Sequence, residues 1–294
     1  MTNDNLPALI TKAVIPAAGL GTRMLPAAKA VPKELLPVLD RPTIQYVVQE
    51  AADAGINEVI LISSPVKRSV ERHFQPDPAM NERLRAVGKE DLLASISDLA
   101  RRIRLHAVDQ PDQRGLGHAV LQARQAVGNE SFLCMLGDTI FSGDSPSRQL
   151  VEAYSRFGTS IIALEEVPFE KVSRYGIAGG AMIESGIMKI DTLIEKPPPD
   201  RAPSRYAVAA RYILTPAIFD CIQRITPGAL GEIQLTDALC LLLEREPIHG
   251  VVLTGKRHDI GNPIDWLMTN IAFAARDPKI WTQLQPLLKS LLQQ

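Results

Sequence analysis

The feature that most constrains the fold is a regular alternation of apolar strand patterns and helical patterns along the first half of the chain. A short apolar run at residues 12–18 ends in a glycine-rich turn, and an amphipathic helix is predicted at 41–55. Further strands are predicted at 58–63, 104–108 and 132–136, with helices at 66–74, within 81–103 and at 116–127. Alternation of this kind is typical of a mostly parallel sheet with helices on both faces. Ligands of such sheets bind beyond the carboxyl ends of the strands.

The second half of the chain is less regular. Strands are predicted at 159–166, 175–183, 187–195, 206–214 and 248–253, and helices at 216–225 and 234–246. We expect an α/β fold in which these strands extend one Rossmann-like sheet and form a small β-rich lobe. Two apolar helices, at 263–275 and 278–292, finish the chain. Their pattern leaves open whether they cap the core or contact a second subunit.

The charge balance argues against two classes of partner. The 294 residues include 32 basic and 33 acidic side chains, with no long block of either sign. Proteins that bind nucleic acid or membrane surfaces need a basic stripe, so we expect neither partner. A polyanionic ligand must therefore be neutralised locally, by a few cations, backbone amides and a metal ion.

Two further absences bear on compartment and chemistry. The three cysteines are widely spaced, which gives neither a disulfide framework nor a zinc site. Residues 1–9 carry no basic region followed by an apolar run, and no apolar stretch reaches about 18 residues. We therefore expect a cytoplasmic protein.

The strongest motif is the glycine-rich turn after the first strand, Ala17-Ala18-Gly19-Leu20-Gly21-Thr22-Arg23. Glycines allow backbone N–H groups to face phosphate oxygens, and Arg23 adds a charged fork. Taken alone, the motif also fits an ordinary turn with a surface arginine. The chain has no P-loop motif, and the dinucleotide-binding pattern fails because Met24 replaces its third glycine.

The continuation of this motif is more specific. Lys33-Glu34-Leu35-Leu36-Pro37 follows the turn, and the segments 115–120 (GLGHAV), 195–197 (EKP), 232–238 (EIQLTDA) and 258–261 (HDIG) come later. Together they resemble the sugar nucleotidyltransferase family, and within it most closely the bacterial UTP–glucose-1-phosphate uridylyltransferases. The resemblance runs from about residue 12 to about residue 262. It implies one nucleotidyltransferase domain over 1–294, with a nucleotide-binding half (10–140), a sugar-binding half (141–262) and C-terminal helices (263–294).

The resemblance assigns roles to residues on the nucleotide side. It implies that the turn and the lysine motif bind the nucleotide through Ala17, Ala18, Gly19, Gly21, Thr22 and Glu34. It also implies that Gln110 and Gly115 contact the uracil. A glutamine amide can both donate to and accept from a pyrimidine edge. Uracil and thymine share that edge, so Gln110 cannot separate UTP from dTTP.

Other roles concern the metal and the sugar. Asp138 follows the predicted strand 132–136, where a carboxylate suits Mg²⁺ or, alternatively, a simple turn. The resemblance implies Mg²⁺ on Asp138 and Asp259. It places Gly176, Glu195, Lys196 and Arg211 on the sugar, with Lys196 holding the sugar phosphate. The implied catalytic set is Arg23, Lys33, Asp138 and Lys196.

The implied reaction joins UTP to glucose 1-phosphate and releases pyrophosphate, in a homo-oligomer. Two alternatives stay open. One is a thymidylyltransferase, or a uridylyltransferase for another hexose 1-phosphate. The other is a catalytically silent nucleotide-binding regulator. The chain departs from the family pattern at Gly137, where proline is more usual, and at Ala210, where glycine usually precedes the Arg-Tyr pair.

Overall fold

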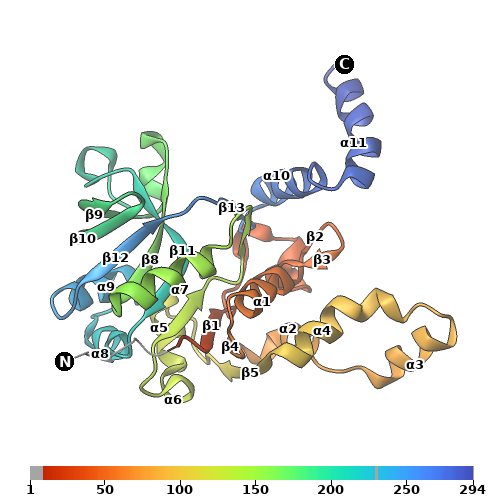
Figure 1. Cartoon of the computed structure of the whole chain (residues 1–294), viewed down its shortest axis with the longest axis horizontal. Helices are drawn as coiled ribbons and strands as arrows, with labels where there is room; N and C mark the ends of the chain where they lie inside the picture. Colours follow the sequence, from red (N-terminus) through yellow and green to blue (C-terminus); the bar gives the residue numbers. More distant parts are fainter. Residues whose placement is uncertain (1–8, 229–230, 294) are drawn as a thin grey trace.

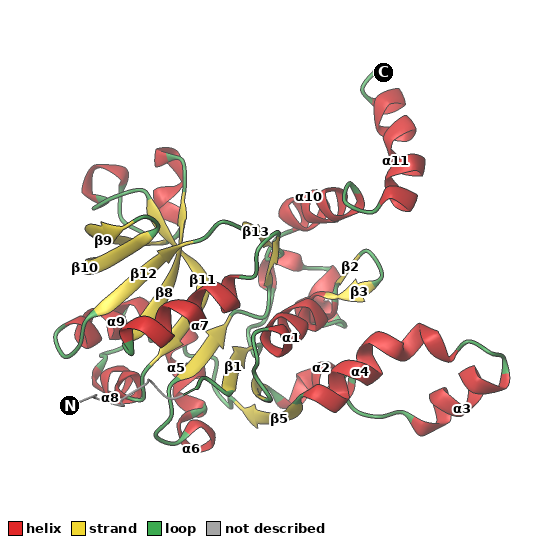
Figure 2. Cartoon of the chain, in the orientation of Figure 1, coloured by secondary structure: helices red, strands yellow, loops and turns green. Residues whose placement is uncertain are grey.

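A nine-stranded sheet organises the computed structural model, which describes residues 9–228 and 231–293 (Figures 1 and 2). Residues 1–8 lie outside the described part. They make up most of the segment 1–9, whose pattern contributed to the expectation of a cytoplasmic protein. The strand order is β5-β4-β1-β6-β11-β8-β12-β10-β9. In chain order the strands are β1 (Lys12–Pro16), β4 (Glu58–Ser63), β5 (Arg104–Asp109), β6 (Phe132–Met135), β8 (Ser160–Glu166), β9 (Gly176–Glu184), β10 (Ile187–Glu195), β11 (Tyr206–Leu214) and β12 (Ile248–Val252).

Both faces of the sheet are covered, which confirms the predicted fold class. Along β1, Ala13 and Ile15 belong to one apolar core and Val14 to the other, because successive side chains point to opposite faces. Strands buried on both faces have few polar positions, as the sequence pattern indicated. One core includes residues of α1 (Thr43–Asp53), α4 (Ala94–Arg102) and α7 (Pro146–Phe157). The other includes residues of α5 (Leu116–Gln122), α6 (Arg124–Val127), α8 (Ala217–Arg224) and α9 (Leu235–Leu243).

The first four strands in the sheet order run in the same direction. β5 pairs with β4, β4 with β1, and β1 with β6, all in parallel register. Their carboxyl ends therefore meet at one edge of the sheet. The glycine-rich turn, Gln110 and Asp138 each follow one of these ends, so the topology brings three separate motifs together.

Most strand pairings in the second half of the chain are antiparallel. β11 is antiparallel to both β6 and β8, and β9 pairs with both β10 and β11. The β9–β10 ribbon forms the predicted β-rich lobe. Two small sheets were not predicted from the sequence. They are β2 (Pro37–Val38) with β3 (Arg41–Pro42), and β7 (Thr139–Ser142) with β13 (Lys256–Asp259).

One predicted helix is divided and one helix was missed. The helix predicted within 81–103 is α4, which is preceded by α3 (Pro78–Ala86), by Gly88 with a left-handed φ of 63°, and by a 3₁₀ turn. The predicted helix 116–127 is divided into α5 and α6. Helix α7 was missed, although Ser145 caps its start and left-handed Gly158 ends it. The short helix α2 (Arg68–Arg72) lies within the predicted 66–74.

The last two helices differ in how they contact the rest of the protein. In α10 (Pro263–Ala274), the Trp266 indole donates to the carbonyl of Pro37 at 2.9 Å, and Phe273 packs edge-on against Tyr46. Helix α11 (Pro278–Leu291) extends away from the sheet and has no buried residue (Figure 1). Only α10 therefore caps the core, and assembly into a homo-oligomer stays a prediction. None of the helices in residues 9–228 and 231–293 is long and apolar enough to cross a membrane.

The departure at Ala210 has a conformational consequence. Ala210 has a φ of 62°, within an irregularity in the β11–β8 pairing between Val208 and Tyr212. A left-handed backbone costs a residue with a Cβ about 1–2 kcal/mol, whereas glycine adopts it freely. The glycine expected at this position therefore matches the local backbone better than the alanine present.

We predict that Ala210→Gly leaves the free energy of unfolding nearly unchanged. Relief of the left-handed strain offsets the loss of a buried methyl, about 0.8 kcal/mol, and the greater entropy of the unfolded chain, about 0.5–1 kcal/mol. Ala209→Gly is the matched control, because Ala209 is buried beside it without positive φ. It should lose about 1.5 kcal/mol in denaturant unfolding. Equal losses in the two variants would contradict the strain at Ala210.

Candidate active site

A cavity of about 540 Å³ lies at the carboxyl ends of the parallel strands. We call it the strand-end cavity. Its walls come from six segments: the glycine-rich turn, the lysine motif, the loop after β5 with the start of α5, the residues after β6, the residue after β10 and the residues before α9. The predicted site residues that line it are Ala18, Gly19, Gly21, Thr22, Arg23, Lys33, Glu34, Gln110, Gly115, Asp138 and Lys196. Residues not predicted but also lining it are Pro16, Leu20, Gln113, Leu116, Ala119, Leu136, Glu232 and Gln234.

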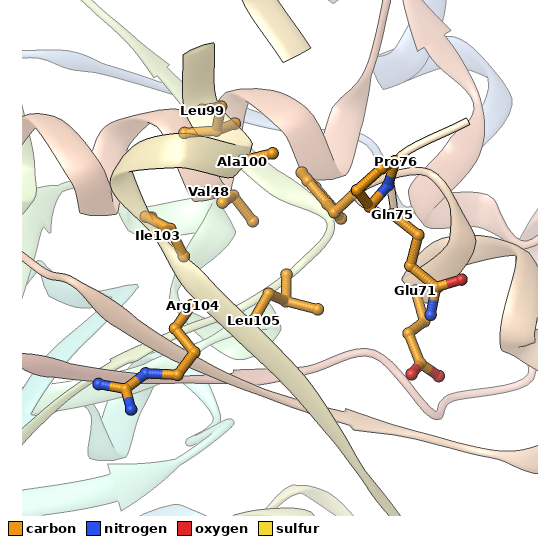
Figure 3. A pocket seen from close by; sticks show the side chains of 10 residues that line it. Val48, Glu71, Gln75, Pro76, Leu99, Ala100, Ile103, Arg104 and Leu105 are labelled. Carbon is orange, nitrogen blue, oxygen red and sulfur yellow. The ribbon is translucent and has the colours of Figure 1, made fainter. Parts of the chain in front are cut away.

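A second cavity, of about 260 Å³, lies near α4 and β5 (Figure 3). Val48, Leu99, Ile103 and Leu105 form its apolar part. No predicted site residue lines it, and it brings together no set of charged groups suited to a phosphate. The strand-end cavity is therefore the better candidate for chemistry.

The backbone of the glycine-rich turn is held from behind by a buried lysine. The Lys67 Nζ donates to the carbonyls of Ala17 at 2.8 Å and Gly19 at 2.5 Å, and to the Glu34 carboxylate at 2.9 and 3.1 Å. Burial lowers the pKa of Lys67 and raises the pKa of Glu34, although each charge favours the other. The lysine is thus committed to three acceptor groups and fixes where the turn's carbonyls point. Gln113 adds a 2.9 Å hydrogen bond to the Ala18 carbonyl.

A second lysine pairs with the predicted metal ligand. The Lys33 Nζ lies 2.5 Å from Asp138 Oδ2. Burial opposes the charge on Asp138, but the charge and hydrogen bond of Lys33, a backbone hydrogen bond and the charge of Arg23 together lower the pKa of Asp138. Burial likewise opposes the charge on Lys33, and the attraction of Asp138 and Glu34 still raises its pKa. Asp138 is therefore an ionised carboxylate at the cavity wall.

The chain offers a second carboxylate beside Asp138. In the β7–β13 sheet Asp259 is the partner of Thr139, the residue after Asp138. Burial and then repulsion from Asp138 raise the pKa of Asp259. A Cβ at Gly261 would lie 2.7 Å from the Arg23 guanidinium and 2.9 Å from Asp259 Oδ1, so glycine leaves room for both. Two mutually repelling carboxylates are a donor set that a divalent cation suits. Within residues 9–228 and 231–293, no cluster of three His, Cys, Asp or Glu side chains has metal-site geometry.

The loop after β5 forms one wall of the cavity. Gln110 is buried, and its backbone N–H donates to the carbonyl of Ser63 at 2.8 Å. Gly115 has a φ of 96°, and a Cβ there would lie 2.7 Å from the carbonyl oxygen of Ile233. The segment 232–238 therefore packs directly on the loop, and only glycine allows that approach.

The end of β10 supplies the opposite wall. Lys196 has a left-handed φ of 46°, and its backbone N–H donates to the Tyr175 carbonyl at 3.0 Å. A non-glycine residue in this conformation stores strain, which is common at functional sites. The neighbouring Glu195 accepts from Thr236 at 2.6 Å, and its carboxylate lies 3.1 Å from where a Cβ of Gly176 would be. Glu195 and Gly176 thus lie beside Lys196, although they do not line the strand-end cavity itself.

The chain is similar to known proteins over nearly its whole length. A family model described as nucleotidyl transferase matches residues 12–275. The chain belongs to this family. A UTP–glucose-1-phosphate uridylyltransferase of Bacillus subtilis (strain 168) is 41% identical over 284 residues, 96% of this chain and 97% of the relative. One from Streptococcus pyogenes is 44% identical over 282 residues, 94% of this chain and 92% of the relative.

Solved structures of UDP-glucose pyrophosphorylases are also similar to this chain. A UDP-glucose pyrophosphorylase complexed with UDP-glucose has a TM-score of 0.85 and 38% identity, covering 92% of this chain and all of that one. A UTP-bound UGPase from Acinetobacter baumannii has a TM-score of 0.89 and 35% identity, covering 96% of this chain and all of that one. The sequence resemblance and the expectation of a nucleotidyltransferase enzyme are confirmed.

Two residue assignments in this nucleotidyl transferase need correction. Arg211 was placed on the sugar, but its side chain is fully buried and pairs with Glu50 at 2.7 Å. Its guanidinium also donates to the carbonyls of Leu136 and Thr139, on either side of Asp138. Ala17 was placed on the nucleotide, but its N–H donates to Ile62 and its carbonyl accepts from Lys67. Its N–H is therefore already used, and Ala17 does not line the strand-end cavity.

Sequence reasoning missed Lys67 and Thr236. Lys67 follows a predicted strand in a Ser-Pro turn, where a lysine is ordinarily solvated. Its burial depends on the lysine motif, 33 residues away, which folds over it. Thr236 lies in the segment 232–238, which was recognised as a motif without a role for the threonine. Both residues act through contacts that no local pattern contains.

We predict that the Lys67–Glu34 pair stabilises the nucleotidyl transferase fold mainly by avoiding unpaired charge. Lys67→Met leaves Glu34 buried without its partner and should cost about 3–5 kcal/mol in denaturant unfolding. In the double variant Lys67→Met/Glu34→Gln, the loss should be clearly smaller than the sum of the two single losses. Strictly additive losses would show that the two groups act independently.

Proposed function

We propose that the chain transfers a uridylyl group from UTP to glucose 1-phosphate and yields UDP-glucose and pyrophosphate. One observation carries this proposal: Arg23, Lys33, Lys196 and Asp138 all line the strand-end cavity, beside the glycine-rich turn. Two polyanionic substrates need such a concentration of cations and backbone amides. Relatives named for this activity match nearly the whole chain, and two similar structures hold UTP or UDP-glucose.

The reaction requires the protein mainly to position the two substrates and to neutralise their charge. An oxygen of the sugar 1-phosphate forms a bond to the α-phosphorus, and the bond from that phosphorus to the pyrophosphate oxygen breaks on the opposite side. The attacking oxygen is already an anion, so no general base is needed. Holding both groups in line and neutralising the charge that builds up supplies the rate enhancement.

The residues divide between the two substrates. The turn from Ala18 to Thr22 offers backbone N–H groups to the triphosphate, and Arg23 and Lys33 stabilise the departing pyrophosphate. Gln110 and Gly115 hold the base. Lys196 holds the attacking phosphate, and the neighbouring Glu195 accepts from sugar hydroxyls. In this proposal residues 10–140 form the nucleotide half and residues 141–262 the sugar half.

Asp138 and Asp259 are the residues that would hold Mg²⁺. Mg²⁺ commonly takes one or two carboxylates together with phosphate oxygens, and bound here it would neutralise charge on both substrates. Burial, and then repulsion from ionised Asp138, raises the pKa of Asp259, and a cation held between the two carboxylates would relieve that repulsion. Lys33 holds one oxygen of Asp138 and keeps that carboxylate ionised.

We predict that Asp138→Asn and Lys196→Met each lower turnover by about 100- to 1,000-fold, because each removes a preorganised charge. Pyrophosphate release with UTP, glucose 1-phosphate and saturating Mg²⁺ is the measurement. Asp191→Asn and Lys189→Met are matched controls on β10, which ends directly before Lys196, since both residues are exposed. Near-normal turnover in Asp138→Asn would remove Asp138 from the mechanism.

The same assay decides among the substrates. UTP, dTTP, CTP and ATP are tested against several hexose 1-phosphates, with and without Mg²⁺. The proposal requires the highest kcat/KM for UTP with glucose 1-phosphate. A preference for dTTP would make the chain a thymidylyltransferase. The absence of release with every nucleotide would favour a silent nucleotide-binding regulator.

A further inference from the structure

The amide of Gln110 is held in one orientation by two acceptors behind it. Its Nε2 lies 2.9 Å from Nδ1 of His118 and 3.5 Å from the carbonyl oxygen of Gly115. A carbonyl oxygen only accepts, so the NH₂ end of the amide faces this side. With both N–H groups occupied, the amide oxygen of Gln110 is the atom left for a ligand in the strand-end cavity.

His118 acts from outside the cavity. It lies on α5 between Leu116 and Ala119, which line the cavity, whereas His118 does not. One turn later, the Gln122 amide lies 3.2 Å from the His118 carbonyl and 3.1 Å from the ring Nε2. When Nδ1 accepts from Gln110, the ring proton is on Nε2, and the Gln122 amide has to give up its hydrogen bond to the His118 carbonyl before its oxygen can accept that proton. The contact that the inference uses is therefore the one between Nδ1 and Gln110.

The exposed amide oxygen has a consequence for the base. Uracil and thymine carry an N–H at N3, whereas cytosine presents a lone pair there. An acceptor pointing into the cavity suits the first two bases and repels the third. If the amide turned over, its NH₂ group would face the base and the preference would weaken or reverse. The orientation of one amide therefore separates two classes of pyrimidine.

We propose that His118 is a positioning residue for base selection, which keeps the Gln110 oxygen toward the cavity by accepting from its NH₂ group. The inference rests on the proposed function for the identity of the substrate. It adds the residue that makes the glutamine discriminate against cytosine. Gln110 touches the base, and His118 acts only through Gln110.

The test is the ratio of kcat/KM for UTP over CTP, measured by pyrophosphate release on the full chain. His118→Phe keeps a ring but removes the acceptor, and the ratio should fall about tenfold, the worth of about one hydrogen bond. His118→Asn can place an oxygen where Nδ1 was and should restore most of the ratio. His118→Leu should repeat the loss without a ring. His106→Phe on β5 is the control, because that histidine lies outside the cavity.

Two results would overturn the inference. One is an unchanged ratio in both His118→Phe and His118→Leu. The other is a loss in His118→Asn as large as in His118→Phe, which would indicate a packing role for the ring. Calorimetric binding of UTP and CTP gives the same ratio without turnover. A wild-type chain that binds UTP but releases no pyrophosphate would therefore contradict the proposed function and leave this inference testable.

Discussion

Two buried cations hold the loops on which the cavity depends. Lys67 binds carbonyls of the glycine-rich turn, and Arg211 binds the carbonyls on either side of Asp138. Each is also paired with a buried or nearly buried carboxylate, Glu34 or Glu50. A buried ion pair is costly unless further hydrogen bonds satisfy it, and both cations have several acceptors. The result is a set of loops whose backbone direction is set before any ligand arrives.

This arrangement reconciles a nearly neutral chain with a polyanionic ligand. The 32 basic and 33 acidic side chains almost cancel, yet Arg23, Lys33 and Lys196 all line one cavity. In a site partly shielded from water, a few fixed charges act more strongly than the same charges spread over the surface. Local placement of charge, rather than net charge, is what the chemistry needs.

The sequence predicted the parts of the site that follow from chain order. The turn after β1, Gln110 after β5 and Asp138 after β6 all lie at strand ends, and parallel pairing brings those ends together. The assignments that were wrong involve burial. Ala17 was placed on the nucleotide, although both its backbone groups are already hydrogen-bonded. Periodicity also predicted one helix at 116–127, which the structure divides into α5 and α6.

By itself, the sequence determined the alternation of strands and helices, the glycine-rich turn and the charged residues available for catalysis. The tertiary structure alone decided which of those charges face the cavity. Arg211 and Lys196 are both basic residues at predicted strands, yet Arg211 is fully buried beside Glu50 and Lys196 lines the strand-end cavity. The physical reason is that burial depends on strand partners far away in the chain: Arg211 pairs with Met135 across the sheet and with Glu50, 161 residues away. Local patterns determine which face a side chain takes, whereas the neighbours it meets there depend on how distant segments pair.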